Sequence, residues 1–288
     1  MSANDGHVVG VVKLVDNGPD TERWNLVIVG DGYQEGELAQ YHVHTQHFVD
    51  RLRSTAPFSE EFGGINVYRI DVVSLESGAD DPGCAGGPVV IAKTYFDATF
   101  CSSFHGEMLD RLLTVDEALV LSVSNDHVPR KHYAVCIVNS PTYGGSGGSI
   151  ATCSVHAQSA TIAIHELGHT AFGLDDEYGG NEDDIPPGEP AKPNVTRDTN
   201  RATNKWRALV AASTPMPTQC NPACVGSGCV APPAPPPPAA VGTYEGAMGK
   251  DCGVYRPMMS CYMRELGRPF CLVCAGVIRE TLQDFQPQ

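Results

Sequence analysis

Long hydrophobic runs are missing from this sequence. The longest apolar stretches, residues 7–15 and 133–138, fall well short of the roughly 20 residues that a membrane-spanning helix needs. The first residues, MSANDGHVVG, also lack the basic and apolar regions of a secretory signal. We therefore expect no transmembrane helix, and the sequence leaves open whether the chain is cytosolic or has already lost a leader.

Basic residues are scarce as well. Lys and Arg number 19 against 34 Asp and Glu, and the formal net charge of −15 would repel a phosphate backbone. Charged residues make up 18% of the chain and hydrophobic ones 42%, without a long block of one charge, which argues against disorder and a coiled coil. We therefore expect a globular protein with a sizeable core and no nucleic-acid partner. The oligomeric state stays unknown.

Alternating strand and helix patterns indicate an α/β fold, in the broad sense that includes α+β. Residues 24–29, 65–74 and 132–140 are rich in β-branched and apolar residues, as in buried strands. Residues 38–52 have the spacing of an amphipathic helix, and residues 108–113 are also predicted to be helical. We expect a mixed sheet with helices packed against it.

An H-E-x-x-H motif occurs at His165, Glu166 and His169. It lies in a helical pattern over residues 159–172, with Gly173 at the position of a C-terminal cap. Two His four residues apart lie on one face of a helix and can share a metal ion, while the Glu, rotated by roughly 100°, can reach a water molecule. One Zn²⁺ ion is the expected occupant. An accidental match on a solvent-exposed helix is the alternative.

A catalytic zinc ion needs a third protein ligand and an open position for water. No His follows His169, so a carboxylate has to serve. In metzincins the ligand comes three residues after the glycine that ends the helix, which indicates Asp176, whereas the usual offset from the first His indicates Asp175. We expect Asp176. A ligand from a later helix, with Glu280 best placed, and an acidic turn without a metal remain alternatives.

Eleven cysteines, seven of them from Cys220 to Cys274, are typical of an oxidising compartment. We therefore expect disulfide bonds and a secreted or cell-surface location. Cys252, Cys261, Cys271 and Cys274 could instead bind a structural zinc ion as four thiolates. The cysteine density favours disulfides, and their pairing stays open.

Composition divides the chain into three regions. Residues 1–180 form the α/β portion that carries the zinc-binding helix. Residues 181–250 are a proline-rich, cysteine-containing excursion, and residues 251–288 are a cysteine-rich part that is expected to complete the catalytic domain.

Several segments are shared with a known family, namely HELGHTAFGLDDEY, VIVGDGY, NSPTYGGSGG and the late YRP and CYM. Together they resemble the IgA-peptidase family of zinc metalloendopeptidases, over nearly the whole chain. The resemblance implies a secreted or surface bacterial peptidase, for which we expect a metzincin-like layout. It also implies zinc held by His165, His169 and Asp176, with Glu166 as the catalytic residue.

The expected function is hydrolysis of peptide bonds in a polypeptide by zinc-bound water that Glu166 activates. Tyr178, Tyr255 and Arg256 are candidate donors to the oxyanion. The resemblance favours Met263 as a methionine turn beneath the metal. Two alternatives are a cell-surface binding module that retains a structural zinc site and a zinc amidase that acts on a small substrate.

An extended stretch, residues 149–155, comes just before the motif helix. It is expected to be the edge strand along which a peptide substrate pairs. The glycine-rich residues 144–148 would then form a mobile lip that permits close backbone approach. A flexible connector without a role is the alternative.

Overall fold

The computed structural model describes residues 5–84, 86–104, 107–180, 187–224, 229–230, 237 and 239–287. Parts of the expected proline-rich region lie outside the described residues, namely residues 181–186, 225–228, 231–236 and 238.

The chain divides into two compact units. The first contains residues 1–171 and 282–288, and the second contains residues 172–281. The regions expected from composition, with boundaries at residues 180 and 250, stay predictions. None of the described helices is long and apolar enough to cross a membrane.

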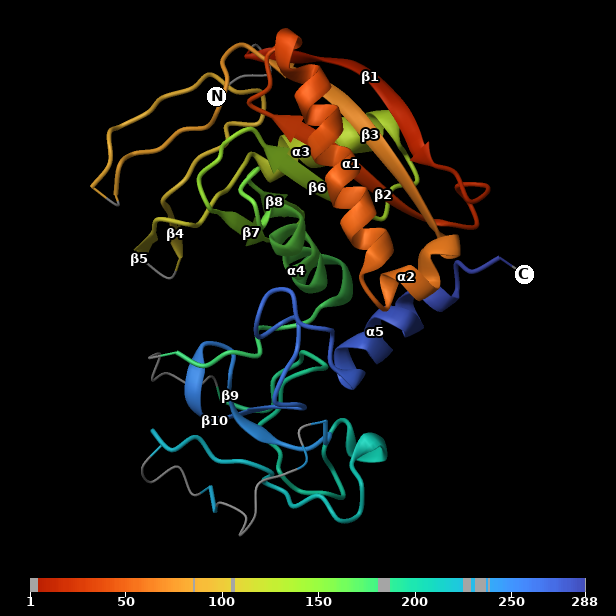
Figure 1. Ribbon diagram of the computed structural model, residues 1–288, viewed down its shortest axis with the longest axis vertical. Helices are drawn as coiled ribbons and strands as arrows, with labels where there is room; N and C mark the ends of the chain where they lie inside the picture. Colours follow the sequence, from red (N-terminus) through yellow and green to blue (C-terminus); the bar gives the residue numbers. More distant parts are fainter. Residues whose placement is uncertain are drawn as a thin grey trace. The chain divides into compact units, whose positions relative to one another are not determined.

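The strands of the first unit are β1 (Gly6–Val15), β2 (Trp24–Asp31), β3 (Ile65–Ser74), β4 (Ser102–Phe104), β5 (Glu107–Leu109), β6 (Tyr133–Val138), β7 (Gly145–Gly147) and β8 (Ala151–Cys153). Six of them form one sheet in the order β1-β3-β2-β6-β8-β7 (Figure 1). The four middle strands are parallel, and the outer strands β1 and β7 pair antiparallel. The mixed sheet expected from the sequence is thus confirmed.

The central strand β2 shows why the sheet lies in the core. Every residue of its sequence, WNLVIVGD, is buried, as expected for a parallel strand covered on both faces. Val27 and Val29 belong to one hydrophobic cluster with Val120 of helix α3 (Glu117–His127). Because successive side chains of a strand alternate, the residues between them point to the opposite face.

Helix α1 (Leu38–Ser54) also packs on this sheet, where it contacts β3 (Figure 1). The hydroxyl of Tyr41 donates a hydrogen bond to the carbonyl of Ile28 at 3.1 Å. The helix predicted over residues 38–52 is therefore confirmed. Its buried residues recur at helical spacing, namely Tyr41, Thr45, Phe48, Val49 and Leu52.

The helix predicted at residues 108–113 is wrong. This stretch contains the end of strand β5. Leu112 forms a bridge to Gly145, and Leu113 is fully buried in the core. A short apolar run does not separate helix from strand, because both can bury it.

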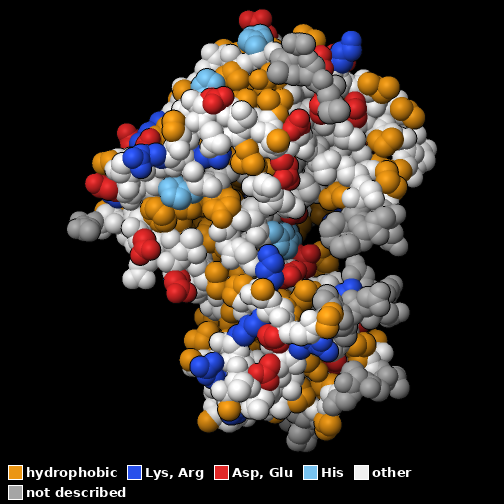
Figure 2. Space-filling model, turned by 180° about the vertical axis from the view of Figure 1, so that it is seen from behind, with side chains coloured by type: hydrophobic (Ala, Val, Ile, Leu, Met, Phe, Trp, Pro, Cys, Tyr) orange, Lys and Arg blue, Asp and Glu red, His pale blue; other side chains and the backbone are white. Residues whose placement is uncertain are grey.

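Among the described residues, the second unit contains one antiparallel strand pair. On the face drawn in Figure 2, acidic and basic side chains are interspersed. The negative net charge is therefore not concentrated in one acidic patch on that face. The remaining elements are Glu35–Glu37, α2 (Phe58–Glu61), Phe62–Gly64, α4 (Ser159–Phe172), Arg207–Leu209, β9 (Tyr244–Ala247), β10 (Lys250–Arg256) and α5 (Leu272–Gln283).

Candidate metal centre

The H-E-x-x-H motif lies on helix α4, as the sequence predicts. Its apolar residues Ile162, Ile164 and Leu167 are buried, so α4 is part of the core and not a solvated surface helix. Gly173 follows with a φ of +62°, the left-handed conformation of a helix C-terminal cap. The predicted helix and its cap are therefore confirmed, and the His pair sits on a rigid element.

The side chains of His165 and His169 converge. Their Nε2 atoms are 3.1 Å apart, and their ring planes meet at 87°. In a tetrahedral zinc site with Zn–N distances of about 2.0 Å, two nitrogen ligands are about 3.3 Å apart. The nitrogen pair on α4 therefore fits a zinc ion. The third ligand, expected at Asp176, lies in the second unit and stays a prediction.

The two candidate aspartates differ in what their carboxylates contact. Oδ1 of Asp175 accepts a hydrogen bond from the backbone N–H of Asp176 at 2.8 Å. The backbone of Asp175 is tied to the buried side chain of Asn194 by two hydrogen bonds of 2.8 Å. The carbonyl of Asp176 accepts a hydrogen bond from Met248 at 2.8 Å. Later residues thus hold the backbone of both aspartates, and the choice of Asp176 as ligand stays a prediction.

Met263, the expected methionine turn, is fully buried. Its carbonyl accepts a hydrogen bond from the backbone N–H of Glu177 at 2.8 Å. Glu177 directly follows Asp176, so this bond helps to fix the segment after α4. The contact is made by the backbone of Met263, and a role of its side chain beneath a metal stays a prediction.

Strand β7 runs close against Glu166. A Cβ atom added to Gly147 would lie 2.9 Å from Oε2 of Glu166 and 3.2 Å from Cβ of His169. A Cβ atom added to Gly145 would lie 2.6 Å from Cγ2 of Ile162. Side chains would crowd the motif helix at both positions. The glycine-rich stretch therefore packs closely against α4. Its expected role as a mobile lip for substrate stays a prediction.

The edge of the sheet is β7, and the expectation of an edge strand at residues 149–155 is wrong. β8 lies one position further in and is paired on both sides. The outer side of β7 is itself partly used, because Gly145 donates to the carbonyl of Arg111 at 3.1 Å and accepts from Leu113 at 3.4 Å. The glycine-rich stretch folds back on β8 and takes the edge position.

Two further candidate residues, Glu280 and Tyr255, lie in the second unit. Glu280 is exposed on α5. Tyr255 is buried in β10, and burial raises its pKa to about 12. A ligand role of Glu280 and a donor role of Tyr255 stay predictions.

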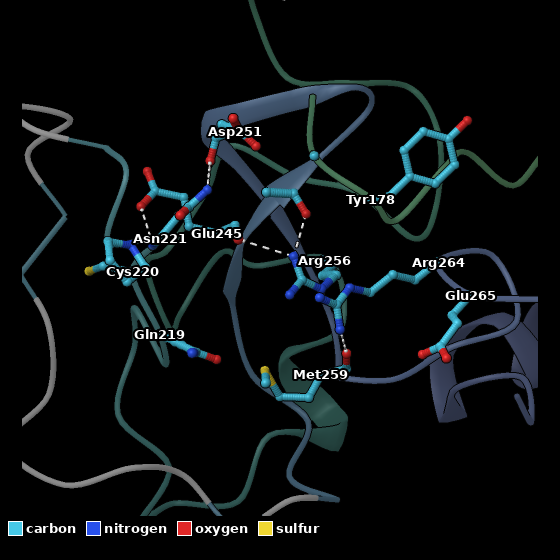
Figure 3. Close-up of a pocket in the computed structure, with 13 residues that line it drawn as sticks. Tyr178, Gln219, Cys220, Asn221, Glu245, Asp251, Arg256, Met259, Arg264 and Glu265 are labelled. Atoms are coloured by element: carbon cyan, nitrogen blue, oxygen red, sulfur yellow. Dashed lines mark hydrogen bonds between the residues drawn. The ribbon is translucent and has the colours of Figure 1, made fainter. Parts of the chain in front are cut away.

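Tyr178 and Arg256 line a hollow of about 480 Å³ in the second unit (Figure 3). Nη1 of Arg256 donates to the carbonyl of Glu245 at 3.0 Å and to the carbonyl of Gly246. Burial lowers the pKa of Arg256 to about 10. The guanidinium therefore contacts the backbone of β9, which gives it a structural role in this unit.

The cysteines divide into two chemical states. Cys252 is bonded to Cys224, so the four-thiolate zinc site weighed in the sequence is wrong. Cys261, Cys271 and Cys274 stay thiols, so disulfide bonds among them are also absent. The disulfide bonds are Cys84–Cys101, Cys220–Cys229 and Cys224–Cys252, and the remaining thiols are those of Cys136 and Cys153.

Two residues with an evident role were not singled out in the sequence. Gly147 lies against Glu166, and the G-G-S-G-G repetition was a signal for close approach without naming its partner. Glu177 is fully buried, although the sequence places it in a run of acidic residues. Its carboxylate can be buried because it contacts residues that are distant in the sequence. No local sequence pattern predicts such contacts.

Comparison with known proteins identifies the family to which this sequence belongs. The family model of IgA Peptidase M64 matches residues 12–224 and 233–282, which include the motif helix, Asp176 and the cysteine-rich end. No curated protein matches the chain. The matched residues cover most of the sequence. The chain therefore belongs to the IgA Peptidase M64 family and is a peptidase, a hydrolase that cleaves peptide bonds.

Proposed function

We propose that this peptidase is a zinc-dependent endopeptidase whose metal ligands are His165, His169 and Asp176. The observation that carries the proposal is the pair of Nε2 atoms 3.1 Å apart on α4. Asp176 is proposed as the third ligand from its position three residues after Gly173. Three protein ligands leave one tetrahedral position for solvent or substrate, as catalytic zinc sites do.

Glu166 is the proposed general base. It directly follows His165 on α4, and the backbone of Gly147 limits where its carboxylate can lie. When bound, zinc would polarise the substrate carbonyl and acidify a water molecule. Glu166 takes a proton from the attacking water and gives it to the departing amine nitrogen. The products are a new carboxyl end and a new amino end of the substrate.

A polypeptide is the proposed substrate, because the family consists of peptidases. Membership of that family also argues against a binding module with a relic zinc site. The three disulfide bonds support a secreted or cell-surface location, since such bonds persist in oxidising compartments.

A digest tests the proposed function directly. The purified protein is incubated with a denatured protein mixture, and new peptide ends are identified by mass spectrometry. We expect internal cleavages that a chelator stops and added Zn²⁺ restores. Release of terminal residues alone would contradict an endopeptidase, and cleavage that persists after complete metal removal would contradict metal dependence.

A separate prediction compares how much Asp175 and Asp176 each contribute to zinc binding. Asp176→Ala should weaken zinc retention at the His site by at least about 100-fold, because it removes one of three ligands. Asp175→Ala is the matched control and should retain zinc much better, since its carboxylate contacts a backbone N–H. Zinc left after dialysis against graded chelator measures both. If Asp175→Ala loses the metal first, the ligand assignment is wrong.

A further inference from the structure

Four buried side chains of the second unit face one another outside the His site. Glu177, Cys261, Cys271 and Cys274 each offer one ligand atom, and these atoms lie within 4.8 Å of one another. None of the four side chains is more than 2% exposed. Three thiols and a carboxylate therefore share a space that is closed to solvent, and no disulfide bond consumes the thiols.

The distances between these atoms fit a tetrahedral metal site. Oε1 of Glu177 is 3.0 Å from Sγ of Cys274 and 3.5 Å from Sγ of Cys271. With Zn–S and Zn–O distances of about 2.3 and 2.0 Å, an oxygen and a sulfur ligand of zinc are about 3.5 Å apart. A metal ion at the centre would therefore need little movement of the side chains.

Backbone N–H groups point at the sulfur atoms. The N–H of Cys271 is 3.3 Å from Sγ of Cys261, and the N–H of Cys274 is 3.4 Å from Sγ of Cys271. Cys271 and Cys274 lie at the start of α5, where the partial positive charge of a helix favours thiolates. The sulfur atoms are thus placed as acceptors.

The carboxylate of Glu177 is incompletely satisfied by the protein. Its Oε1 accepts a hydrogen bond from Nδ2 of Asn194 at 3.1 Å. Its Oε2 is buried and has no hydrogen-bond partner among the described residues. Such a group is costly to bury unless a cation or a donor meets it. Arg256 interacts electrostatically with Glu177 and Cys261 and would offset part of the negative charge that thiolates bring.

We propose that Cys261, Cys271, Cys274 and Glu177 bind a second zinc ion. Three thiolates and one carboxylate are a closed set of four ligands, which leaves no position for water and makes this ion structural. It binds as the three thiols release their protons. The proposal stands on residues of the second unit and does not depend on the activity proposed above. Because Glu177 follows Asp176, the ion also anchors the segment that presents Asp176.

Zinc content per chain tests the proposal, measured by inductively coupled plasma mass spectrometry. We expect about two ions in the wild type and about one in the double variant His165→Ala/His169→Ala, which retains the thiol site. A folded double variant without zinc would overturn the proposal. One ion in the wild type and one in the double variant would support the thiol site and contradict the His site, so the two failures are distinguishable.

Cobalt provides a second measurement, which identifies thiolate ligands by their absorption. The double His variant loaded with Co²⁺ should show thiolate-to-metal charge-transfer absorption, which nitrogen and oxygen ligands do not give. Its absence would overturn the proposal. Adding Cys271→Ala should remove the band, whereas Cys136→Ala, which changes a buried thiol of β6 outside the cluster, should keep it. Loss of the band in both variants would contradict the ligand assignment.

Discussion

Glu166→Gln is expected to lower the rate of peptide hydrolysis by about 10²–10⁴-fold while zinc stays bound. Gln has nearly the same shape as Glu but cannot accept a proton from water. The His ligands are unchanged, so metal content and folding should match the wild type. Cleavage of a quenched fluorescent peptide gives kcat and KM, and the loss should fall mainly on kcat, because the proton is transferred during the chemical step.

Glu280→Gln is the matched control for this substitution. Glu280 is exposed on α5 and is not one of the proposed ligands, so the same chemical change there should leave both zinc content and kcat unaltered. Loss of zinc in this control would support Glu280 as a ligand. Wild-type turnover by Glu166→Gln would remove Glu166 from its role.

Gly147→Ala is expected to reduce kcat by about 10- to 100-fold, because small displacements of a catalytic group are costly. The added methyl group would lie 2.9 Å from Oε2 of Glu166 and 3.2 Å from Cβ of His169. The carboxylate is at the end of a flexible side chain and can move away, whereas the contact with Cβ of His169 requires only a small shift between β7 and α4. Zinc content should be close to that of the wild type, and KM should change less than kcat.

Gly10→Ala is the control for the glycine substitution. Gly10 also lies in a strand of the same sheet, and an added Cβ meets nothing within 4 Å. Its activity and its urea midpoint should equal those of the wild type. If Gly147→Ala retains full activity, then contact with β7 does not position Glu166.

The elements that the sequence predicted correctly share one property, which is that local pattern alone decides them. The run WNLVIV is long enough and apolar enough to specify a buried central strand, and the structure buries all of it. The motif helix combines apolar spacing with a terminal Gly173, and both signals agree. Its motif also placed the two His on one face, because the helical repeat fixes that geometry.

What the sequence could not predict depends on residues that are distant in the chain. The backbones of Asp175 and Asp176 are held by Asn194 and Met248, contacts that a count of residues from the glycine does not contain. Pairing of Cys252 with Cys224 was likewise open, because cysteine spacing does not determine disulfide connectivity. Local pattern was also too weak for residues 108–113, where an apolar run became strand and turn.

The segment after α4 has a practical consequence for truncation. Its backbone is held by Asn194, Met248 and Met263, which all come later in the chain than the helix itself. A fragment that stops before β9 would retain the full H-E-x-x-H sequence and lose two of these three anchors. A fragment trimmed to the H-E-x-x-H region would therefore leave the backbone around Asp176 poorly held. The last part of the chain is needed to fix this segment.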